Sequence, residues 1–270
     1  MLEGKIMSAV AHRVLYIVGR WIWRVLKYFI AGSYANRLFE TDFARRLRGA
    51  PTKRDAHFMT WQEKYERHNG TLEPLTDNYR ATMMGAGNIT DLAFFEGKIV
   101  VDIGSGPACT LCWIPNAKAR IGIDPLADRF MELGIASHDM LYLNAPGERI
   151  PLPSGYVDVV ISINALDHVE DPMAVMNEID RILRLGGHFI GSIGFKEKPT
   201  FTEPHILSRK LIETKLLHDW TQEFSMIRPK GPSPKEFYRF FHEEPPADYE
   251  AEELIWWCRY RKPEKLNQAA

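Results

Sequence analysis

Hydrophobic and polar positions alternate along the chain with two different periods. From about residue 76 to residue 195, short β-branched runs are separated by segments in which apolar residues recur every three or four positions, most clearly over 172–184. Seven runs predict strands: 98–103, 119–124, 141–143, 157–163, 187–193, 220–227 and 252–260. Strands that alternate with helices form parallel sheets covered on both faces. We therefore predict an α/β fold with a doubly wound, mostly parallel seven-stranded sheet.

The alternation ends after residue 195. Residues 204–219 predict one more helix, and a Pro-rich, acidic loop follows from Pro229 to about Asp248. Loops that leave a sheet after its central strands are where binding residues concentrate. We predict that residues 195–251 are an insertion that faces the substrate.

Residues 12–32 have helical periodicity with an uneven division of side chains. At about 100° per residue, a wide Trp-rich apolar surface is interrupted by one narrow basic stripe, formed by Arg13, Arg20, Arg24 and Lys27. Three interpretations stay open. The segment is a core or oligomer-interface helix, it lies in the headgroup region of a membrane, or it spans the bilayer. Spanning costs about 3 kcal/mol for each centrally placed basic side chain.

Residues 33–70 continue as a basic segment whose aromatic residues are spaced three to five apart. The turn-rich stretch 69–74 then marks a boundary. We predict a helical N-terminal extension over residues 1–70 and the α/β domain over residues 71–270.

Charge is distributed unevenly along the 270 residues, whose net charge is −1. Residues 1–54 carry eleven basic and three acidic side chains, and the remainder carries 23 basic and 32 acidic ones. This pattern predicts that residues 10–54 contact a membrane surface or another copy of the chain, and the acidic body argues against nucleic acid. Three cysteines and the lack of a signal-peptide pattern predict a cytoplasmic protein, peripheral at the inner membrane surface if the arm binds lipid.

The stretch "VVDIGSGPACT" (100–110) places a glycine turn at the end of a predicted strand. Gly104 and Gly106 allow the backbone to approach a ligand closely, and Asp124 ends the next strand, where an acid can accept hydrogen bonds from ribose hydroxyls. Cys109 stands where a dinucleotide fingerprint has its third glycine, and the Lys-Ser/Thr of a phosphate loop is missing. Asp102 would repel phosphate but suits a ligand with a cationic amino group.

Four segments in this order resemble the successive motifs of class I S-adenosylmethionine-dependent methyltransferases, in the subgroup that acts on small molecules, lipids and sugars. They are "VVDIGSGPACT", "GIDPL", "ERIPLPSGYVDVVISINALDHVEDP" and "RILRLGGHFIGSI". The resemblance covers about residues 76–195. It implies a Rossmann-like fold, with S-adenosylmethionine as cofactor and S-adenosylhomocysteine as product.

The resemblance also implies roles for individual residues. Asp102 lies near the cofactor's amino group, and Asp124 holds its ribose. The remaining cofactor contacts are Gly104, Ser105 and Gly106 at the methionine part, Gly147 and Glu148 at the adenine edge, and Asn164, Ala165 and Leu166 at the methionine and sulfonium end. Three positions depart from the family's pattern: Ala108, Pro146 and Asp167. Of these, Pro146 implies that backbone groups recognise the adenine.

Two histidines are candidates for a general base that takes a hydroxyl proton. His205 follows the fifth predicted strand, behind Pro204, and His168 follows the fourth. Each has a structural alternative, in which the side chain only holds a loop or a helix start. Cys109 and Cys112 form a C-x-x-C without a second Cys/His pair at ligand spacing, and a helix expected directly after the glycine turn explains the small residues there. We therefore predict neither a metal site nor a redox role for this pair.

These residues predict methyl transfer to a small-molecule acceptor, with O-methylation of a sugar or metabolite hydroxyl as the favoured reaction and a lipid-linked acceptor included. C-methylation of a quinone- or polyketide-type acceptor is a second hypothesis, since such carbon nucleophiles need little help from a base. A third is a non-catalytic partner subunit that keeps the fold and uses its basic arm to bind a membrane or protein.

Overall fold

The computed structural model describes residues 50–72, 75–196, 203–215, 217–231, 243–246, 249 and 253–264. The predicted helix over 12–32 and most of the basic arm lie outside the described residues. The chain divides into two compact units, Met1–Thr60 and Trp61–Ala270. The described part of the first unit, residues 50–60, contains the start of helix α4 (Lys53–Arg67). There the Asp55 amide donates to the Thr52 hydroxyl (3.2 Å), and the Asp55 carboxylate accepts from the Thr52 amide (3.0 Å).

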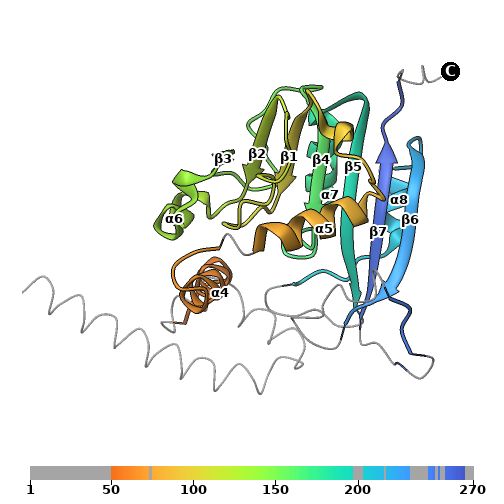
Figure 1. The fold of residues 1–270 in the computed structure, drawn as a ribbon. Coiled ribbons are helices and arrows are strands. Elements are labelled where there is room, and N and C mark those ends of the chain that lie inside the picture. The colour runs from red at the N-terminus through yellow and green to blue at the C-terminus, as the bar shows by residue number, and fades with distance from the viewer. Residues whose placement is uncertain are drawn as a thin grey trace, which may run out of the picture. The chain divides into compact units, whose positions relative to one another are not determined.

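The second unit is built on one seven-stranded sheet (Figure 1). Its strands, in spatial order, are β3 (Leu141–Leu143), β2 (Ala119–Ile123), β1 (Ile99–Ile103), β4 (Val157–Ile163), β5 (Leu183–Lys196), β7 (Glu253–Arg261) and β6 (Thr221–Pro229). The first five are parallel, and β7 runs antiparallel to both β5 and β6. The predicted doubly wound, mostly parallel sheet is confirmed.

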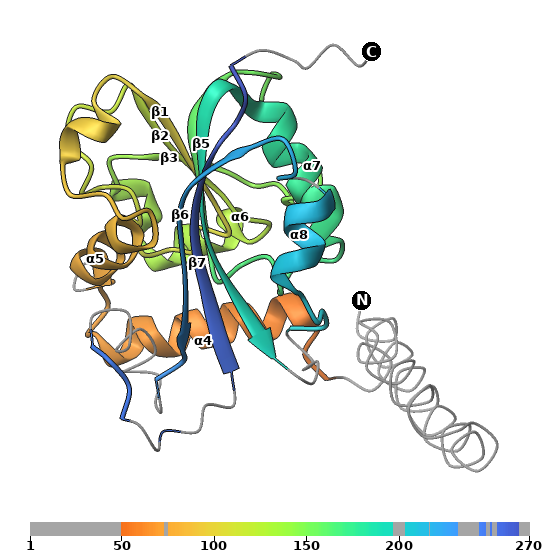
Figure 2. The ribbon, with the colours of Figure 1, turned by 90° about the vertical axis from the view of Figure 1, so that its right-hand side faces the viewer.

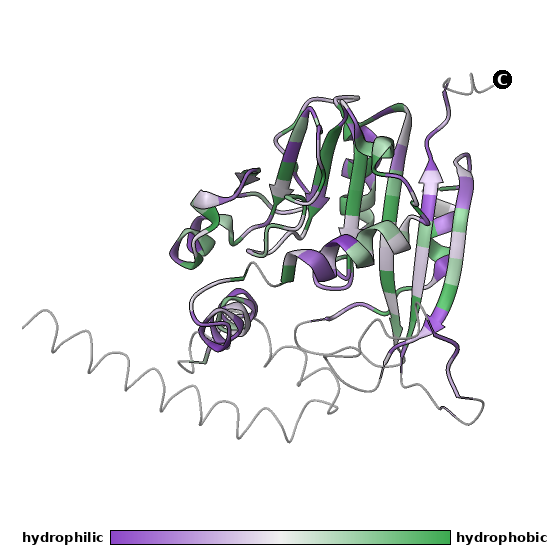
Figure 3. Cartoon of the chain, viewed as in Figure 1, coloured by the Kyte–Doolittle hydropathy of each residue, from purple (hydrophilic) through white to green (hydrophobic). Residues whose placement is uncertain are grey.

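Helices cover both faces of this sheet (Figure 2). One face packs on α5 (Thr76–Ala86) and the 3-10 helix η2 (Leu92–Phe95), and the other packs on α7 (Pro172–Ile182) and α8 (Arg209–Lys215). Short helices link β2 to β3: α6 (Ala127–Phe130), η3 (Met131–Leu133) and η4 (Ile135–Ser137). All five residues of β1 are buried, which is why its sequence is nearly continuously apolar, and hydrophobic residues concentrate along the central strands (Figure 3).

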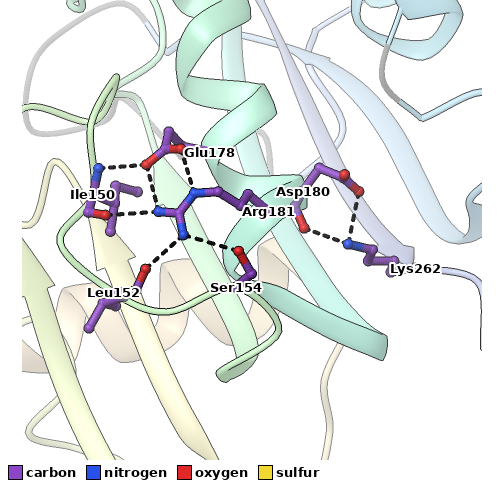
Figure 4. Close-up of polar contacts among 7 residues, drawn as sticks. All are labelled: Ile150, Leu152, Ser154, Glu178, Asp180, Arg181 and Lys262. Carbon is purple, nitrogen blue, oxygen red and sulfur yellow. Dashed lines mark hydrogen bonds and ion pairs between the residues drawn. The ribbon is translucent and has the colours of Figure 1, made fainter.

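Helix α7 begins and ends with specific polar contacts. Asp171 caps its start by accepting from the amides of Met173 (2.9 Å) and Ala174 (3.1 Å), with Pro172 at the first helical position. At the other end, the Arg181 guanidinium binds Glu178 and donates to the carbonyls of the loop before β4, which lie at Ile150 and Leu152 (Figure 4). The helix thereby fixes the loop that leads into β4.

Two predicted helices differ from the observed ones. Among the described residues of the helix predicted over 204–219, helix α8 covers Arg209–Lys215, and the Ser208 hydroxyl, which accepts from the Leu211 amide (3.3 Å), places its start. The helix expected directly after the glycine turn is absent, and the described residues 104–118 form turns instead. Its place is taken by left-handed backbone at Gly104, Gly106, Cys109 and Asn116, which interrupts any helical run.

Candidate active site

The predicted cofactor residues meet at the carboxyl ends of three neighbouring strands. β1 pairs with β2 on one side and with β4 on the other, so that Asp102 lies level with Gly122 and Ile161. The glycine turn follows β1, Asp124 follows β2, and residues 164–166 follow β4. In open α/β sheets this edge is where ligands bind.

The glycine turn is held in a form that requires glycine. Gly104 has φ +75°, and a Cβ added there would lie 2.5 Å from the Cβ of Ala165. Asn164, also in the left-handed region at φ +51°, donates its amide hydrogen to the Ser192 carbonyl of β5 (3.0 Å). The turn after β1 and the turn after β4 are therefore in van der Waals contact, as a shared ligand site needs.

Asp124 connects two turns through its carboxylate. One oxygen accepts from the Gly106 amide (3.1 Å), and the other accepts from the Leu126 amide (2.9 Å). An ionised carboxylate offers about four acceptor positions, so turn capping and ribose binding are compatible. The ribose role of Asp124 remains a prediction.

Asp102 is the buried acid of the site, with 2% of its surface exposed. Burial raises the pKa of its carboxyl to about 7; a hydrogen bond from the Thr110 hydroxyl (2.5 Å) opposes this shift, and the charge of Asp124 adds to it. Such a carboxyl gains most from a cationic partner, because a positive charge offsets the cost of burying its ionised form.

The other predicted cofactor residues contribute in different ways. The side chains of Ser105 and Leu166 are buried in packing, the former against Gly122 of β2. Gly147 lies against Ile103 and Val175, and any side chain at this position would have to displace one of these neighbours. The Glu148 carboxylate accepts from the amides of Glu170 (2.7 Å) and Asp171 (3.1 Å), just before α7. Their adenine and methionine contacts remain predictions.

Three contributions to the site were not predicted. Trp61, the first residue of the second unit, lies so close to Gly106 that an added Cβ would be 2.8 Å from its ring. Thr110 binds Asp102, and the partly buried Tyr79 of α5 lies within electrostatic reach of the same carboxyl. The aromatic spacing around Trp61 indicated only a helix, since spacing does not reveal which tertiary contact an aromatic side chain makes.

Cys109 and Cys112 form a disulfide, with their Cα atoms 5.4 Å apart. The prediction that this pair has no redox role assumed a helix after the glycine turn, where small residues would be explained by packing. With no helix there, the disulfide closes a tight turn around Thr110. The third cysteine, Cys258, is free and buried in β7.

A second group of polar side chains lies where β4 and β5 end. His168 Nε2 is 3.8 Å from a carboxylate oxygen of Asp167 and 3.6 Å from one of Glu203. His205 lies beside them, and its Nε2 donates to the Val169 carbonyl at 2.9 Å. The two histidine candidates for a general base are thus brought to the same edge as the predicted cofactor residues.

The residues at this edge fit S-adenosylmethionine. A buried acid with a raised pKa suits its ammonium, a half-buried carboxylate at the end of the next strand suits its ribose, and a turn without Cβ atoms leaves room for a close approach. No phosphate-binding element competes with this assignment in the motif. The donor set matches the cofactor that the sequence predicts.

Comparison with known proteins gives the same answer. Residues 101–191 match the family model of a methyltransferase domain. An uncharacterised methyltransferase of Mycobacteroides abscessus is 35% identical over 143 residues, which cover 48% of this chain and 51% of that protein. One of Mycobacterium sp. strain JLS is 34% identical over 93 residues, 34% of this chain and 36% of that protein. The chain thus spans between about a third and a half of the length of these relatives.

Two solved structures share the fold. One is from the complex of the Haloferax volcanii Trm112 methyltransferase activator with a methyltransferase: TM-score 0.51, 19% identity, covering 70% of this chain and 92% of that one. The other is the [4+2]-cyclase SpnF: TM-score 0.51, 17% identity, covering 71% and 81%. The fold, the residues at the site and the family-model match together indicate a class I S-adenosylmethionine-dependent methyltransferase. Residues 101–191 match the methyltransferase-domain family model, and this match together with the fold supports S-adenosylmethionine as cofactor.

Proposed function

We propose that the protein transfers a methyl group from S-adenosylmethionine to a hydroxyl of a small-molecule acceptor, a sugar or metabolite, which includes lipid-linked ones. The observation that carries this proposal is the meeting of Asp102, the glycine turn and Asp124 at one sheet edge inside the methyltransferase-domain match. The histidines beside that edge favour a hydroxyl acceptor over a carbon acceptor, because a hydroxyl must lose its proton.

S-adenosylmethionine, when bound, would supply an electrophilic methyl group on a positively charged sulfonium. The protein's part is mainly to align the acceptor oxygen with this methyl group. His205 is suited to take the hydroxyl proton, because donation from Nε2 to the Val169 carbonyl fixes the neutral tautomer with its lone pair on Nδ1. A His205→Gln variant should keep cofactor affinity and lose most of its turnover with a hydroxyl acceptor.

Calorimetry with S-adenosylmethionine tests the cofactor assignment. We expect the full chain to bind one equivalent and Asp124→Asn to bind at least about tenfold more weakly, since an amide cannot replace both acceptor oxygens. Asp219→Asn is a matched control, because this exposed acid pairs with His218 away from the site. Failure of the unmodified chain to bind would refute the enzyme proposal.

Mass spectrometry identifies the acceptor. A panel of hydroxylated metabolites and lipid-linked sugars is incubated with the protein and cofactor, and products that gain one methyl group are located by NMR. A methyl ether supports O-methylation, and a new carbon–carbon bond supports the alternative. Cofactor binding without any product would favour the non-catalytic subunit; the likeness to the cyclase SpnF shows why fold alone does not decide the reaction.

The basic arm, residues 10–54, is proposed to contact an anionic membrane surface, which its charge supports. Within the described part of the chain, no helix has the length and apolar character needed to cross a bilayer. Co-sedimentation with vesicles rich in anionic lipid tests the contact. Equal pelleting of the full chain and a variant with its arm arginines changed to glutamine would contradict it.

A further inference from the structure

We infer that Asp167, His168 and Glu203 form a binding site for a divalent transition-metal cation of the Mn²⁺ type, an assignment that goes beyond the proposed function. One ligand atom from each residue lies within 4.8 Å of the other two. His168 Nε2 lies 3.6 Å from a carboxylate oxygen of Glu203 and 3.8 Å from one of Asp167. A small inward movement brings such atoms to the spacing at which three ligands share one ion.

The chemistry of these donors favours a cation. Asp167 is 2% exposed, and a second carboxylate, that of Glu203, lies in the same cluster. A cation between the enclosed Asp167 carboxylate and the partly exposed Glu203 carboxylate would offset their mutual repulsion and the cost of burying Asp167. One imidazole nitrogen and two carboxylates form a mixed nitrogen and oxygen set, which suits transition cations better than Mg²⁺ or Ca²⁺.

The site is open on one side, as a catalytic site requires. The side chains of His168 and Glu203 are 21% and 22% exposed, whereas Asp167 is enclosed. Three protein ligands with an open position leave room for water or for a substrate oxygen. The arrangement therefore differs from a closed structural site.

The position of the cluster ties it to the proposed reaction. Asp167 follows Ala165 by two residues, and Ala165 touches Gly104 of the glycine turn. Glu203, in the segment that follows β5, lies beside His168. The hydrogen bond from His205 to the Val169 carbonyl holds this segment next to the turn after β4. If the proposed function holds, the cation binds the acceptor hydroxyl and stabilises its deprotonated oxygen; that oxygen takes the methyl carbon, sulfur keeps the bonding pair, and the proton goes to His205 or water.

The alternative is a histidine that only pairs with the two acids and binds no metal. Electron paramagnetic resonance separates the two, because free Mn²⁺ gives a strong signal in solution that bound Mn²⁺ loses. We titrate the full chain, without S-adenosylmethionine, and expect one Mn²⁺ per chain. His168→Gln and Glu203→Gln should each weaken binding at least about tenfold. His218→Gln is the matched control, since His218 also lies beside an acid, Asp219, at 3.1 Å.

The outcomes are distinct. Absence of Mn²⁺ binding by the unmodified chain overturns the site, and so does binding that survives both His168→Gln and Glu203→Gln. Circular dichroism tests whether each variant is folded. Both substitutions lie at partly exposed positions, so a loss of Mn²⁺ binding in a folded variant is not an effect of unfolding. Because the titration needs no cofactor, failure of the chain to bind S-adenosylmethionine would refute the proposed function while leaving the metal result intact.

Discussion

At the scale of single residues, Asp102 is the most informative position. Its sequence context, an acid directly before a glycine turn, predicts a partner for a cationic amino group, and this role stays a prediction. The carboxyl is enclosed, receives one hydrogen bond from Thr110, and has a pKa raised to about 7 by burial. The ionised form is therefore the state that a bound ammonium stabilises.

Cofactor affinity should consequently increase with pH across this range. Below pH 7 Asp102 is mostly protonated and offers no charge to the ligand, so binding at about pH 7.5 should be roughly tenfold tighter than at about pH 5.5. The upper pH of this comparison stays below the pKa of an α-amino group, about 7.7, so that the cofactor's amino group is still mostly protonated. Calorimetry at both pH values measures the change. Asp102→Asn should bind weakly with little pH dependence; a variant that keeps the full dependence would rule out Asp102 as its source.

Gly104 allows a test of the contact between the two turns. Gly104→Ala adds a methyl group 2.5 Å from the Ala165 Cβ and forces alanine into φ +75°. We expect the free energy of unfolding to fall by about 1–3 kcal/mol, measured by denaturant titration. Gly134→Ala is the control: it also has positive φ, but nothing lies within 4 Å of the added carbon. Equal losses in both variants would mean that backbone strain alone, not the contact, accounts for the effect.

At the scale of elements, the segment after the glycine turn departs most from expectation. Small residues such as Ala108 and Cys109 fit a helix packed on a sheet, and the periodicity of so short a segment cannot exclude one. The left-handed Cys109, at φ +49°, and the disulfide to Cys112 instead close a turn that presents Thr110 to Asp102. Strand positions were predicted well because most are short apolar runs between turn residues, whereas turns closed by side-chain bonds leave no periodic signal.

Removing this disulfide should have two separable effects. For a loop of four residues, chain entropy accounts for about 2 kcal/mol of stability, so Cys109→Ser/Cys112→Ser should unfold at lower denaturant concentration. Cofactor affinity should also fall severalfold, because Thr110 loses its fixed position beside Asp102. Denaturant titration and calorimetry measure the two quantities. Unchanged affinity would show that the turn keeps its shape without the bond.

At the scale of the whole molecule, the fold could be predicted from the sequence more fully than the grouping of the site residues. The fold was predictable because five strand runs in alternation with helices, followed by two more strands, allow few topologies. The grouping of Asp167, His168 and Glu203 was not, because residues 35 positions apart meet only when β4 and β5 are paired. Local sequence carried no information about that encounter.

The burial of the Asp102 carboxyl imposes a cost on the folded protein without its cofactor, and this cost should make the free energy of unfolding depend on pH. The unfolded chain releases the Asp102 proton near its ordinary pKa of 3.8, whereas the folded chain keeps it up to about pH 7. The folded state thus binds more protons between these values, and the contribution of Asp102 to the free energy of unfolding falls as pH rises from about 4 to about 7. Comparison of the unmodified chain with Asp102→Asn by denaturant titration isolates this contribution. A difference between the two that does not change with pH would contradict the raised pKa.

The order of the strands has a consequence for how the chain reaches this state. β7 is the last strand in sequence, yet it lies between β5 and β6 and buries Trp256 and Trp257 almost completely. Until residues 253–261 leave the ribosome, the long edge of β5 and the whole of β6 have no strand to pair with, and such exposed edges favour intermolecular association. Residues 221–229 must therefore wait for residues 253–261 before the sheet can close, and the interval between the synthesis of these two segments is the period of greatest vulnerability to aggregation.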